Sequence, residues 1–532
     1  MSRPGLEQSD VCPQALAFGQ SRGGMADGQS KRTGGRRSRM ALRAAGPALN
    51  PAPPGQDGGS YRPLTDAESA QIFDAALTLL ADLGMGEVPD RLAEVLTKAG
   101  ATEDTRGRFL LPRPLVREAI KCANKRFALH GRDPARTIEV GGRLVHFGTG
   151  GAAVQTLDLE TQNYRPSTLR DLYDFTRLQD QLTNVSWFTR CCVATDVPGE
   201  FDLDVNTVFA LLKGTTKPVA TSFTLAEHVA PIVRMLDMAE GRPGAFSARP
   251  YVKAHISPVI SPMRYGEDAV DVTFACIAHN IPLSCITAAQ SGATAPATLA
   301  GFLAQSLAET LASLVMVHAI KPGHPMVFSN WPLVIDLRTG AFSGGGGEVA
   351  LLNAASAQLS NWLGLPSGVA ASMTDSKVLD TQYGVEKGMT ALAAGLAGGN
   401  LIYESSGMMA ALLGASFEGF VADDEMISAI YRMLRGVEVS KTTLNLESIE
   451  AAILGDGHFL GGAETLASME RDYYYPGLSD RIDPRSWEQK GRQDLAARAR
   501  TKAKELLANP DPTYLDAAAE KEIRREFNIL LD

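Results

Sequence analysis

The fold is decided by residues 336–407, DLRTGAFSGGGGEVALLNAASAQLSNWLGLPSGVAASMTDSKVLDTQYGVEKGMTALAAGLAGGNLIYESSG. Apolar residues recur at helical spacing over 349–363, and a second helical pattern covers about 377–396. Short apolar runs at 369–373 and 401–403 follow Gly-containing turns, and polar residues come directly after each run. Helix and strand therefore alternate. Polar side chains at strand ends are typical of a barrel whose chemistry lies at the carboxyl ends of its strands.

The same alternation continues along the middle of the chain. Strands are expected at 185–192, 218–223, 251–256, 282–287, 325–329, 367–373, 400–404 and 419–423. Helices are expected at 201–213, 224–240, 264–279, 296–320, 346–363 and 376–397, with a looser pattern at 407–417 and a last helix at 423–435. The pattern predicts an α/β fold, a (β/α)8 TIM-type barrel over residues 181–436. An open doubly wound sheet is the alternative, but the chain has no GxGxxG phosphate loop.

Three further segments flank the predicted barrel. Residues 1–60 are rich in Gly, Pro, Arg, Ser and Gln without hydrophobic periodicity, which predicts a disordered tail. Residues 61–180 combine helical patterns with short alternating runs, so we expect an N-terminal subdomain that begins at a capping box, Thr65 with Glu68. Residues 437–532 predict a C-terminal helical appendage.

Composition narrows the class of protein. The chain has 532 residues, of which 45% are hydrophobic, so it can bury a large core. Its net charge of −9 argues against nucleic-acid binding. The six cysteines show no metal-ligand spacing, so we expect reduced thiols in the cytoplasm. The first 30 residues lack the apolar segment of a secretory signal. The longest apolar helix, near 307–320, contains Glu309 and His318 and is too short to span a bilayer, so no membrane association is expected.

The strand ends supply the candidate site: His255, Asn330, Trp331, Asp375, Tyr403 and Glu404. Spacing gives no metal site, since HxH, HExxH and tight His/Asp clusters are absent from the sequence. Lys253 is expected inside its strand, so a strand-end lysine for a Schiff base is also lacking. Aromatic rings with carboxylates are what a quaternary ammonium requires, because ring faces attract the cation and a carboxylate balances its charge. The alternative is ordinary packing for the aromatic residues and helix capping for Asp375.

Two motifs have simpler explanations than the ligands they suggest. The glycines at 344–347 precede a helix and could bind phosphate, but Glu348 at that helix start would repel an anion, so a tight loop is favoured. Residues 456–461 fit DxHxxG, a loop in which histidine ligates a corrinoid cobalt. The following 71 residues are helical and charged rather than βαβ, which favours a loop histidine at His458 over a cobalt ligand.

Five longer stretches resemble one family, the trimethylamine:corrinoid methyltransferase (MttB-like) family. They are HFGTGGAAVQTLDLETQNYRPSTLRDL (146–172), SGATAPATLAGFLAQSLAETLASLVMV (291–317), DLRTGAFSGGGGE (336–348), TDSKVLDTQYGVEKG (374–388) and GDGHFLGGAETL (455–466). The resemblance implies a (β/α)8 barrel that moves a methyl group from a methylated amine to the Co(I) of a separate corrinoid protein. The chain itself would bind no cofactor, and we expect a homo-oligomer.

The resemblance also bears on the substrate. Archaeal trimethylamine enzymes of the family carry pyrrolysine, which rough position puts near 371–374, where this chain has only standard residues. The chain is thus similar to non-pyrrolysine relatives, several of which use quaternary amines such as glycine betaine, proline betaine or carnitine. A quaternary nitrogen is already a leaving group, so no adduct-forming residue is required. Trimethylamine or another tertiary amine is the alternative. Rival classes are a non-catalytic amine sensor and a barrel lyase.

The expected roles follow from strand-end position. Trp331 and Tyr403 would enclose the ammonium, and Glu404 or Asp375 would balance its charge. Asn330 and His255 would orient the substrate. The family-like motifs add four further residues: Glu348, Asp380, Gln382 and Glu386. Asp380, Gln382 and Glu386 could simply tie a helix to a strand.

Overall fold

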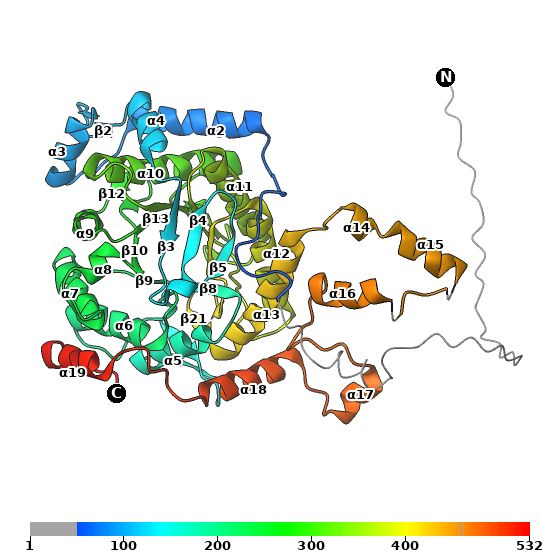
Figure 1. Cartoon of the computed structure of the whole chain (residues 1–532). Helices are drawn as coiled ribbons and strands as arrows, with labels where there is room; N and C mark the ends of the chain where they lie inside the picture. The colour runs from blue at the N-terminus through cyan, green and yellow to red at the C-terminus, as the bar shows by residue number, and fades with distance from the viewer. Residues whose placement is uncertain (1–49, 456, 461) are drawn as a thin grey trace, which may run out of the picture. The chain divides into compact units, whose positions relative to one another are not determined.

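A closed barrel of eight parallel strands forms the centre of the computed structural model, which describes residues 50–455, 457–460 and 462–532 (Figure 1). Around the barrel the strands are β5 (His146–Gly148), β8 (Val185–Thr189), β9 (Val219–Thr221), β10 (Val252–Ile256), β13 (Leu283–Thr287), β15 (Met326–Asn330), β18 (Ser367–Ala370) and β19 (Leu401–Tyr403). The barrel closes where Leu401 of β19 pairs with His146 of β5. The predicted (β/α)8 barrel is confirmed.

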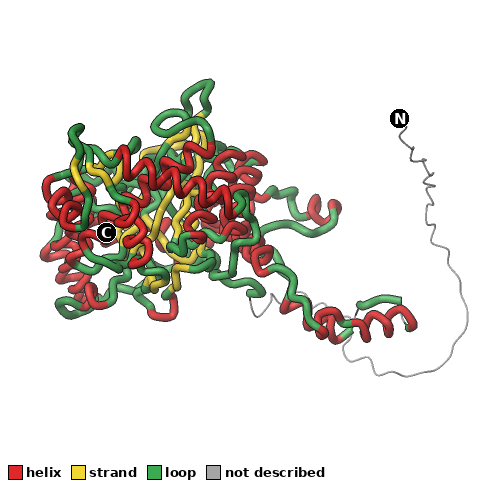
Figure 2. The backbone as a smooth tube through the Cα atoms, turned by 90° about the horizontal axis from the view of Figure 1, so that it is seen from above, coloured by secondary structure: helices red, strands yellow, loops and turns green. Residues whose placement is uncertain are grey.

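Helices surround the strands, as Figure 2 shows with helices in red and strands in yellow. The helices that follow the barrel strands are α5 (Leu169–Asp180), α6 (Glu200–Gly214), α7 (Val229–Ala239), α9 (Glu267–Ala278), α10 (Leu299–Ile320), α11 (Gly347–Trp362), α12 (Thr381–Ala397) and α13 (Phe417–Arg435). The strands are buried on both faces, which is why their sequences read as continuous apolar runs rather than as an alternation. Local chemistry sets the ends of α12: Asp380 accepts a hydrogen bond from the Tyr383 amide, and Gly398 ends the helix in the left-handed conformation.

One predicted barrel strand was wrong, and the strand that replaces it comes from an earlier part of the chain. Residues 419–423 belong to α13, because Ser416 caps a helix whose buried Phe417, Phe420 and Val421 recur at helical spacing. The first barrel strand is β5, which lies in the range 61–180 that we had assigned to the N-terminal subdomain. The looser helix expected at 407–417 is a hairpin of β20 (Met408–Met409) and β21 (Gly414–Ser416).

The N-terminal helices α2 (Asp66–Thr78), α3 (Asp90–Lys98) and α4 (Arg113–Cys122) pack against α10. The predicted capping box is present, since the Thr65 hydroxyl accepts from the Glu68 amide and the Glu68 carboxylate accepts from the Thr65 amide. Short antiparallel pairs follow: β1 (Thr102–Glu103) with β2 (Phe109–Leu110), β3 (Arg126–Leu129) with β4 (Ile138–Gly141), and β6 (Gln155–Leu157) with β7 (Tyr164–Pro166).

The expected disorder of residues 1–60 was wrong for their last part. Residues 1–49 lie outside the described residues. From residue 50 onward the segment packs on the barrel: the Gly55 amide donates to the Val145 carbonyl at 2.9 Å and the Gly59 amide to the Leu396 carbonyl at 2.7 Å. Ala52 is buried. A segment poor in apolar residues is thus ordered through backbone hydrogen bonds, which composition does not reveal.

The C-terminal residues form α14 (Lys441–Leu444), α15 (Leu446–Leu454), α16 (Ala463–Arg471), α17 (Pro484–Gln489), α18 (Leu495–Leu507) and α19 (Ala517–Glu526). α18 packs on α13 and α5, and α19 packs on α7. No described residue of α14, α15 or α16 is buried. The apolar helix near 307–320, which we expected to be too short to span a bilayer, is part of the longer α10. Among the described residues α10 is the one helix long and apolar enough to cross a membrane, but 83% of its most apolar window is buried inside the protein.

Candidate active site

Four aromatic side chains gather inside the barrel toward the carboxyl ends of its strands, and we call them the aromatic cluster: Trp187, His255, Trp331 and Tyr403. Alternate residues of a barrel strand point inward, which brings these side chains together from β8, from β10, from the residue directly after β15 and from β19. The ring centroids of Trp331 and Tyr403 lie 4.8 Å apart, those of His255 and Trp331 5.3 Å, and those of Trp187 and Tyr403 4.5 Å. Three of the four were predicted from the sequence. Trp187 was not.

The buried side chain of Lys253 lies against this cluster. The sequence did not mark it as a site residue, because it lies inside its strand and not at the strand end. Lys253 Nζ donates to Tyr403 Oη at 2.8 Å and to Ser284 Oγ at 3.1 Å. The same nitrogen lies 4.9 Å from the Trp187 ring and 4.8 Å from the Tyr403 ring. Burial lowers the pKa of Lys253 to about 7. Lys253 precedes His255 by two residues, so strand alternation could have identified it as a neighbour on the same inward face.

His255 lies at the partly exposed side of the cluster. Desolvation lowers its pKa well below the ordinary value, with smaller contributions from the positive charges of Lys253 and Arg190. The imidazole is therefore neutral at physiological pH. A neutral ring between two basic residues can contact a cation without repelling it.

Glu404 is the most unusual carboxylate of the barrel. Its side chain is fully buried, neither carboxylate oxygen has a hydrogen-bond partner among the described residues, and its backbone adopts φ of 63°. Burial raises its pKa to about 8, although Lys387 and the Gly151 amide favour the charged form. Positive φ at a non-glycine residue and an unpaired buried carboxyl both cost stability, and such costs concentrate at functional sites.

The loop after β5 covers Glu404 with two glycines. A Cβ placed on Gly150 would lie 2.5 Å from Glu404 Oε1, and one on Gly151 would lie 2.9 Å from Glu404 Oε2. Gly151 also has φ of 78°, a conformation that other residues rarely adopt. The loop therefore needs glycine to approach the carboxyl this closely.

A buried ion pair between Lys387 and Asp423 holds the turn that contains Glu404. Lys387 Nζ donates to the backbone oxygens of Ser372, Glu404 and Met408, and lies 3.2 Å from Asp423 Oδ2. Asp423 also accepts from Tyr383 Oη at 2.8 Å. Lys387 thus holds the turn after β19 by its main chain, which fixes the position of Glu404. The sequence placed Asp423 at a strand end, whereas it reaches this network from α13.

The remaining predicted residues lie outside the aromatic cluster. Asp375 accepts from the Gly344 amide at 2.7 Å, and its own amide donates to Glu386 Oε2 at 2.8 Å. Gln382 donates to Glu386 Oε1, and Asp380 caps α12. These contacts join the glycine loop, the turn after β18 and α12. They support the tie between helix and strand, and Asp375 shows no contact with the aromatic cluster.

Asn330 and Glu348, two further predicted residues, do not point toward the aromatic cluster. Asn330 Nδ2 donates to Ser306 Oγ of α10 at 3.2 Å, so its side chain faces the helix layer rather than the neighbouring Trp331. Glu348 is exposed in the first turn of α11, where its charge suits the helix dipole. His458 is exposed, and the other charged residue of its motif, Asp456, lies outside the described residues together with Gly461.

The carboxyl ends of four adjacent strands also share buried polar atoms without a partner among the described residues. These atoms are Thr287 Oγ1, Asn330 Oδ1, Trp331 Nε1, Ser372 Oγ, both Glu404 carboxylate oxygens and Ser406 Oγ. They lie at or just after the ends of β13, β15, β18 and β19, which are neighbours in the barrel. Unpaired polar atoms are rare in protein interiors. The two unpaired oxygens of Glu404 therefore make this carboxyl a candidate binding group, whereas the Asn330 side chain faces α10.

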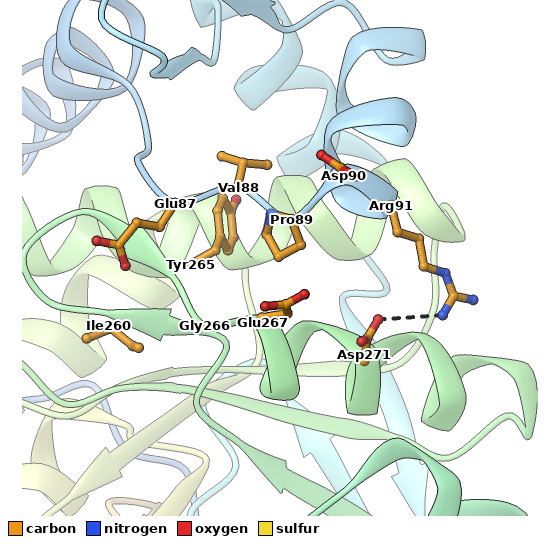
Figure 3. Close-up of a pocket in the computed structure, with 10 residues that line it drawn as sticks. All are labelled: Glu87, Val88, Pro89, Asp90, Arg91, Ile260, Tyr265, Gly266, Glu267 and Asp271. Carbon is orange, nitrogen blue, oxygen red and sulfur yellow. Dashed lines mark ion pairs between the residues drawn. The ribbon is translucent and has the colours of Figure 1, made fainter.

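A separate cavity of about 650 Å³ lies outside the aromatic cluster (Figure 3). It is formed by the residues that lead into α3, by the start of α9 and by Tyr265 of β12 (Arg264–Tyr265). Carboxylates line it at Glu87, Asp90, Glu267 and Asp271, the last within 3.7 Å of Arg91. None of the predicted site residues borders this cavity.

A family model described as trimethylamine methyltransferase (MTTB) matches residues 32–528. The chain belongs to this family. Glycine betaine methyltransferase from Desulfitobacterium hafniense (strain Y51) is 28% identical over 458 residues, which cover 86% of this chain and 94% of that protein. Trimethylamine methyltransferase MttB from Methanosarcina barkeri is 30% identical over 473 residues, which cover 86% of this chain and 93% of its own.

Family membership confirms the resemblance seen in the sequence and makes the chain a methyltransferase. Solved structures give a weaker likeness. A dihydropteroate synthase from Coxiella burnetii is 13% identical, and the match covers 59% of this chain and 100% of that protein, with a TM-score of 0.35.

Proposed function

We propose that the chain transfers a methyl group from a quaternary amine that carries a carboxylate, a betaine, to the Co(I) of a separate corrinoid protein. The observation that carries this proposal is the aromatic cluster beside the unpaired, buried carboxyl of Glu404, in a member of an amine methyltransferase family. The corrinoid is here a substrate brought by a partner, which would dock over the carboxyl end of the barrel. The reaction would take place in the cytoplasm.

The aromatic cluster suits an ammonium group. The ring centroids of Trp331, Tyr403 and His255 lie within 5.7 Å of one another, and each aromatic face that meets a desolvated cation contributes about 0.5–2 kcal/mol. Lys253 already occupies the neighbourhood of Tyr403 and Trp187, so the ammonium would lie on the side of Trp331 and His255. The neutral state of His255 avoids repulsion there.

Glu404 would provide the balancing charge. Its carboxyl is protonated near neutral pH in the free protein, because its pKa is raised to about 8. A bound cation favours the carboxylate, so binding would release this proton. In the transfer the C–N bond breaks and its electron pair stays on nitrogen, while Co(I) supplies the pair for the new Co–C bond. The chain's residues hold the N-methyl group in line and exclude water.

Arg190 favours a betaine over trimethylamine or choline. It directly follows β8, is only partly exposed and makes no hydrogen bond or ion pair among the described side chains. Desolvation lowers its pKa, and its charge acts on His255 of the aromatic cluster. The charge of Asp204 favours the charged guanidinium, but the Asp204 carboxylate is itself bound by Thr224 and His228. A substrate carboxylate would form the bidentate pair that arginine prefers. Arg190 lies within the strand predicted at 185–192, and no sequence pattern distinguishes it as a binding residue.

The test is a substrate panel with reduced corrinoid and an optical readout of methylcobalt formation. We expect methyl transfer from one or more of glycine betaine, proline betaine and carnitine, and none from choline or trimethylamine. Arg190→Gln should reduce kcat/KM for the betaine at least tenfold, and Lys98→Gln, an exposed basic residue of α3, is the matched control. Transfer from trimethylamine would favour the tertiary-amine alternative. Betaine binding without transfer from any amine would favour a sensor.

A further inference from the structure

Residues 437–470, which we call the arm, expose an unusual amount of apolar surface. The arm contains α14, α15 and α16, and ten of its apolar side chains are 39% to 87% exposed, the most exposed being Val437, Leu454 and Val439. Together they expose on the order of 1,000 Å² of apolar surface, more than the few hundred Å² in one patch on a typical monomer. A standard protein interface needs about 800 Å² from each partner.

The arm begins at the end of the barrel opposite to the aromatic cluster. Along α13, Asp423 lies near the turn that contains Glu404. About two turns later, the Tyr431 hydroxyl accepts from the Phe147 amide in β5. It ends at Arg435, which donates to the Pro51 carbonyl and lies 3.2 Å from Asp472. The arm therefore leaves and rejoins the body at one place, at the amino end of the barrel, and Figures 1 and 2 show its helices standing out from the barrel.

Charge indicates what covers the arm. Residues 437–470 contain six acidic residues and one basic residue. The segment 481–504 contains eight basic and three acidic residues, and it exposes Ile482 and Leu495. An acidic apolar surface and a basic surface with apolar residues are complementary, and the same chain carries both.

We propose that the arm binds the 481–504 surface of a second copy of this chain, while the arm of that copy binds the first. Two such equal contacts close a two-fold dimer, which needs no further partner. A membrane is disfavoured because the acidic arm would be repelled by anionic lipids. A corrinoid protein is disfavoured because it must reach the opposite end of the barrel.

The first experiment measures the mass of the full-length chain by light scattering and sedimentation at 1–50 µM. The wild type should be dimeric or larger, and Ile453→Glu with Leu454→Glu should dissociate it, because two charges would enter the buried contact. Val385→Glu on α12 is the control, because Val385 is 60% exposed and lies outside the arm, and it should leave the mass unchanged. A monomeric wild type, or a doubly substituted arm that still dimerises, would overturn the proposal.

The second experiment tests the charges and does not depend on the apolar substitutions. Glu447 and Glu450 in the arm, and Arg485 and Lys490 opposite, are exposed and form no ion pair within the described chain. Glu447→Lys with Glu450→Lys should weaken dimerisation at least tenfold, and so should Arg485→Glu with Lys490→Glu. Mixing the two variants should restore dimers, because both contacts of the mixed pair are then complementary. If mixing restores nothing, the arm does not meet this surface.

Discussion

At the scale of single residues, Glu404, which we propose balances the charge of the substrate, makes the stability of the fold depend on pH. Its carboxyl is buried without a partner and its pKa is raised to about 8 from 4.5. The folded state therefore binds the proton more tightly than the unfolded state. The stability that this proton contributes is complete below about pH 4.5 and is lost as the pH rises to about 8. A site built to receive a cation has this property before the cation arrives.

We expect Glu404→Gln to make the protein more stable than the wild type at alkaline pH, because the amide never carries the buried charge. The difference in the free energy of unfolding should be small near pH 5 and grow by up to ~1.4 kcal/mol per pH unit until about pH 8. Urea denaturation at pH 5, 6.5 and 8 measures it. Glu348→Gln, at an exposed carboxylate, should show no such growth. Parallel pH curves for Glu404→Gln and the wild type would show that Glu404 is solvated.

At the scale of elements, β5 depends on chain segments that are remote in sequence. It has only three residues, and it is a barrel strand because β19 and β8 pair with its two edges. The segment at 50–60 adds hydrogen bonds beside it, from Gly55 to Val145 and from Gly58 to Arg143. A Cβ on Gly58 would lie 2.3 Å from the Gly395 carbonyl oxygen, so this segment packs closely on the end of α12.

Two truncations test this segment. A chain that begins at residue 60 should unfold more easily than one that begins at residue 50, by about 2–4 kcal/mol, because it loses several backbone hydrogen bonds and the burial of Ala52. A disordered tail over residues 1–60, as predicted from the sequence, would give no such difference. Thermal melts with native circular dichroism compare the two chains. Identical melting temperatures would show that the segment only rests on the surface.

At the scale of the whole molecule, the C-terminal residues divide into two parts. α18 and α19 complete the core, since Ala499, Ala503 and Ile523 are fully buried. The last residues are also tied to α6, where Asn206 accepts from the Leu530 amide at 2.7 Å. The described residues of the arm, by contrast, add no buried side chain to the core of their own chain. One appendage thus contains an element needed for folding and another that is free to contact a partner.

This division predicts opposite results for two deletions. Replacing residues 437–470 by a short Gly-Ser linker should leave the chain folded, because the Arg435 side chain reaches the Arg471 carbonyl and the Asp472 carboxylate, which brings the two ends within the span of such a linker. Removing residues 484–532 should expose the apolar faces of α13, α5 and α7 and cause aggregation. Light scattering and circular dichroism distinguish the two outcomes. An unfolded linker variant would mean that the arm is part of the folding core.

The sequence by itself determined the barrel, seven of its eight strands and the aromatic residues at their ends, because strand and helix periodicities are local and are written in neighbouring residues. Only the tertiary structure decided the rest. β5 is a strand through its two neighbours, and Lys253 belongs with Tyr403 because the barrel brings β10 and β19 face to face across its interior. The turn of Asn330 toward α10, the isolation of Glu404 and the unpaired charge of Arg190 depend on which groups surround each side chain. Burial and hydrogen-bond pairing join residues far apart in the chain, and no local pattern encodes them.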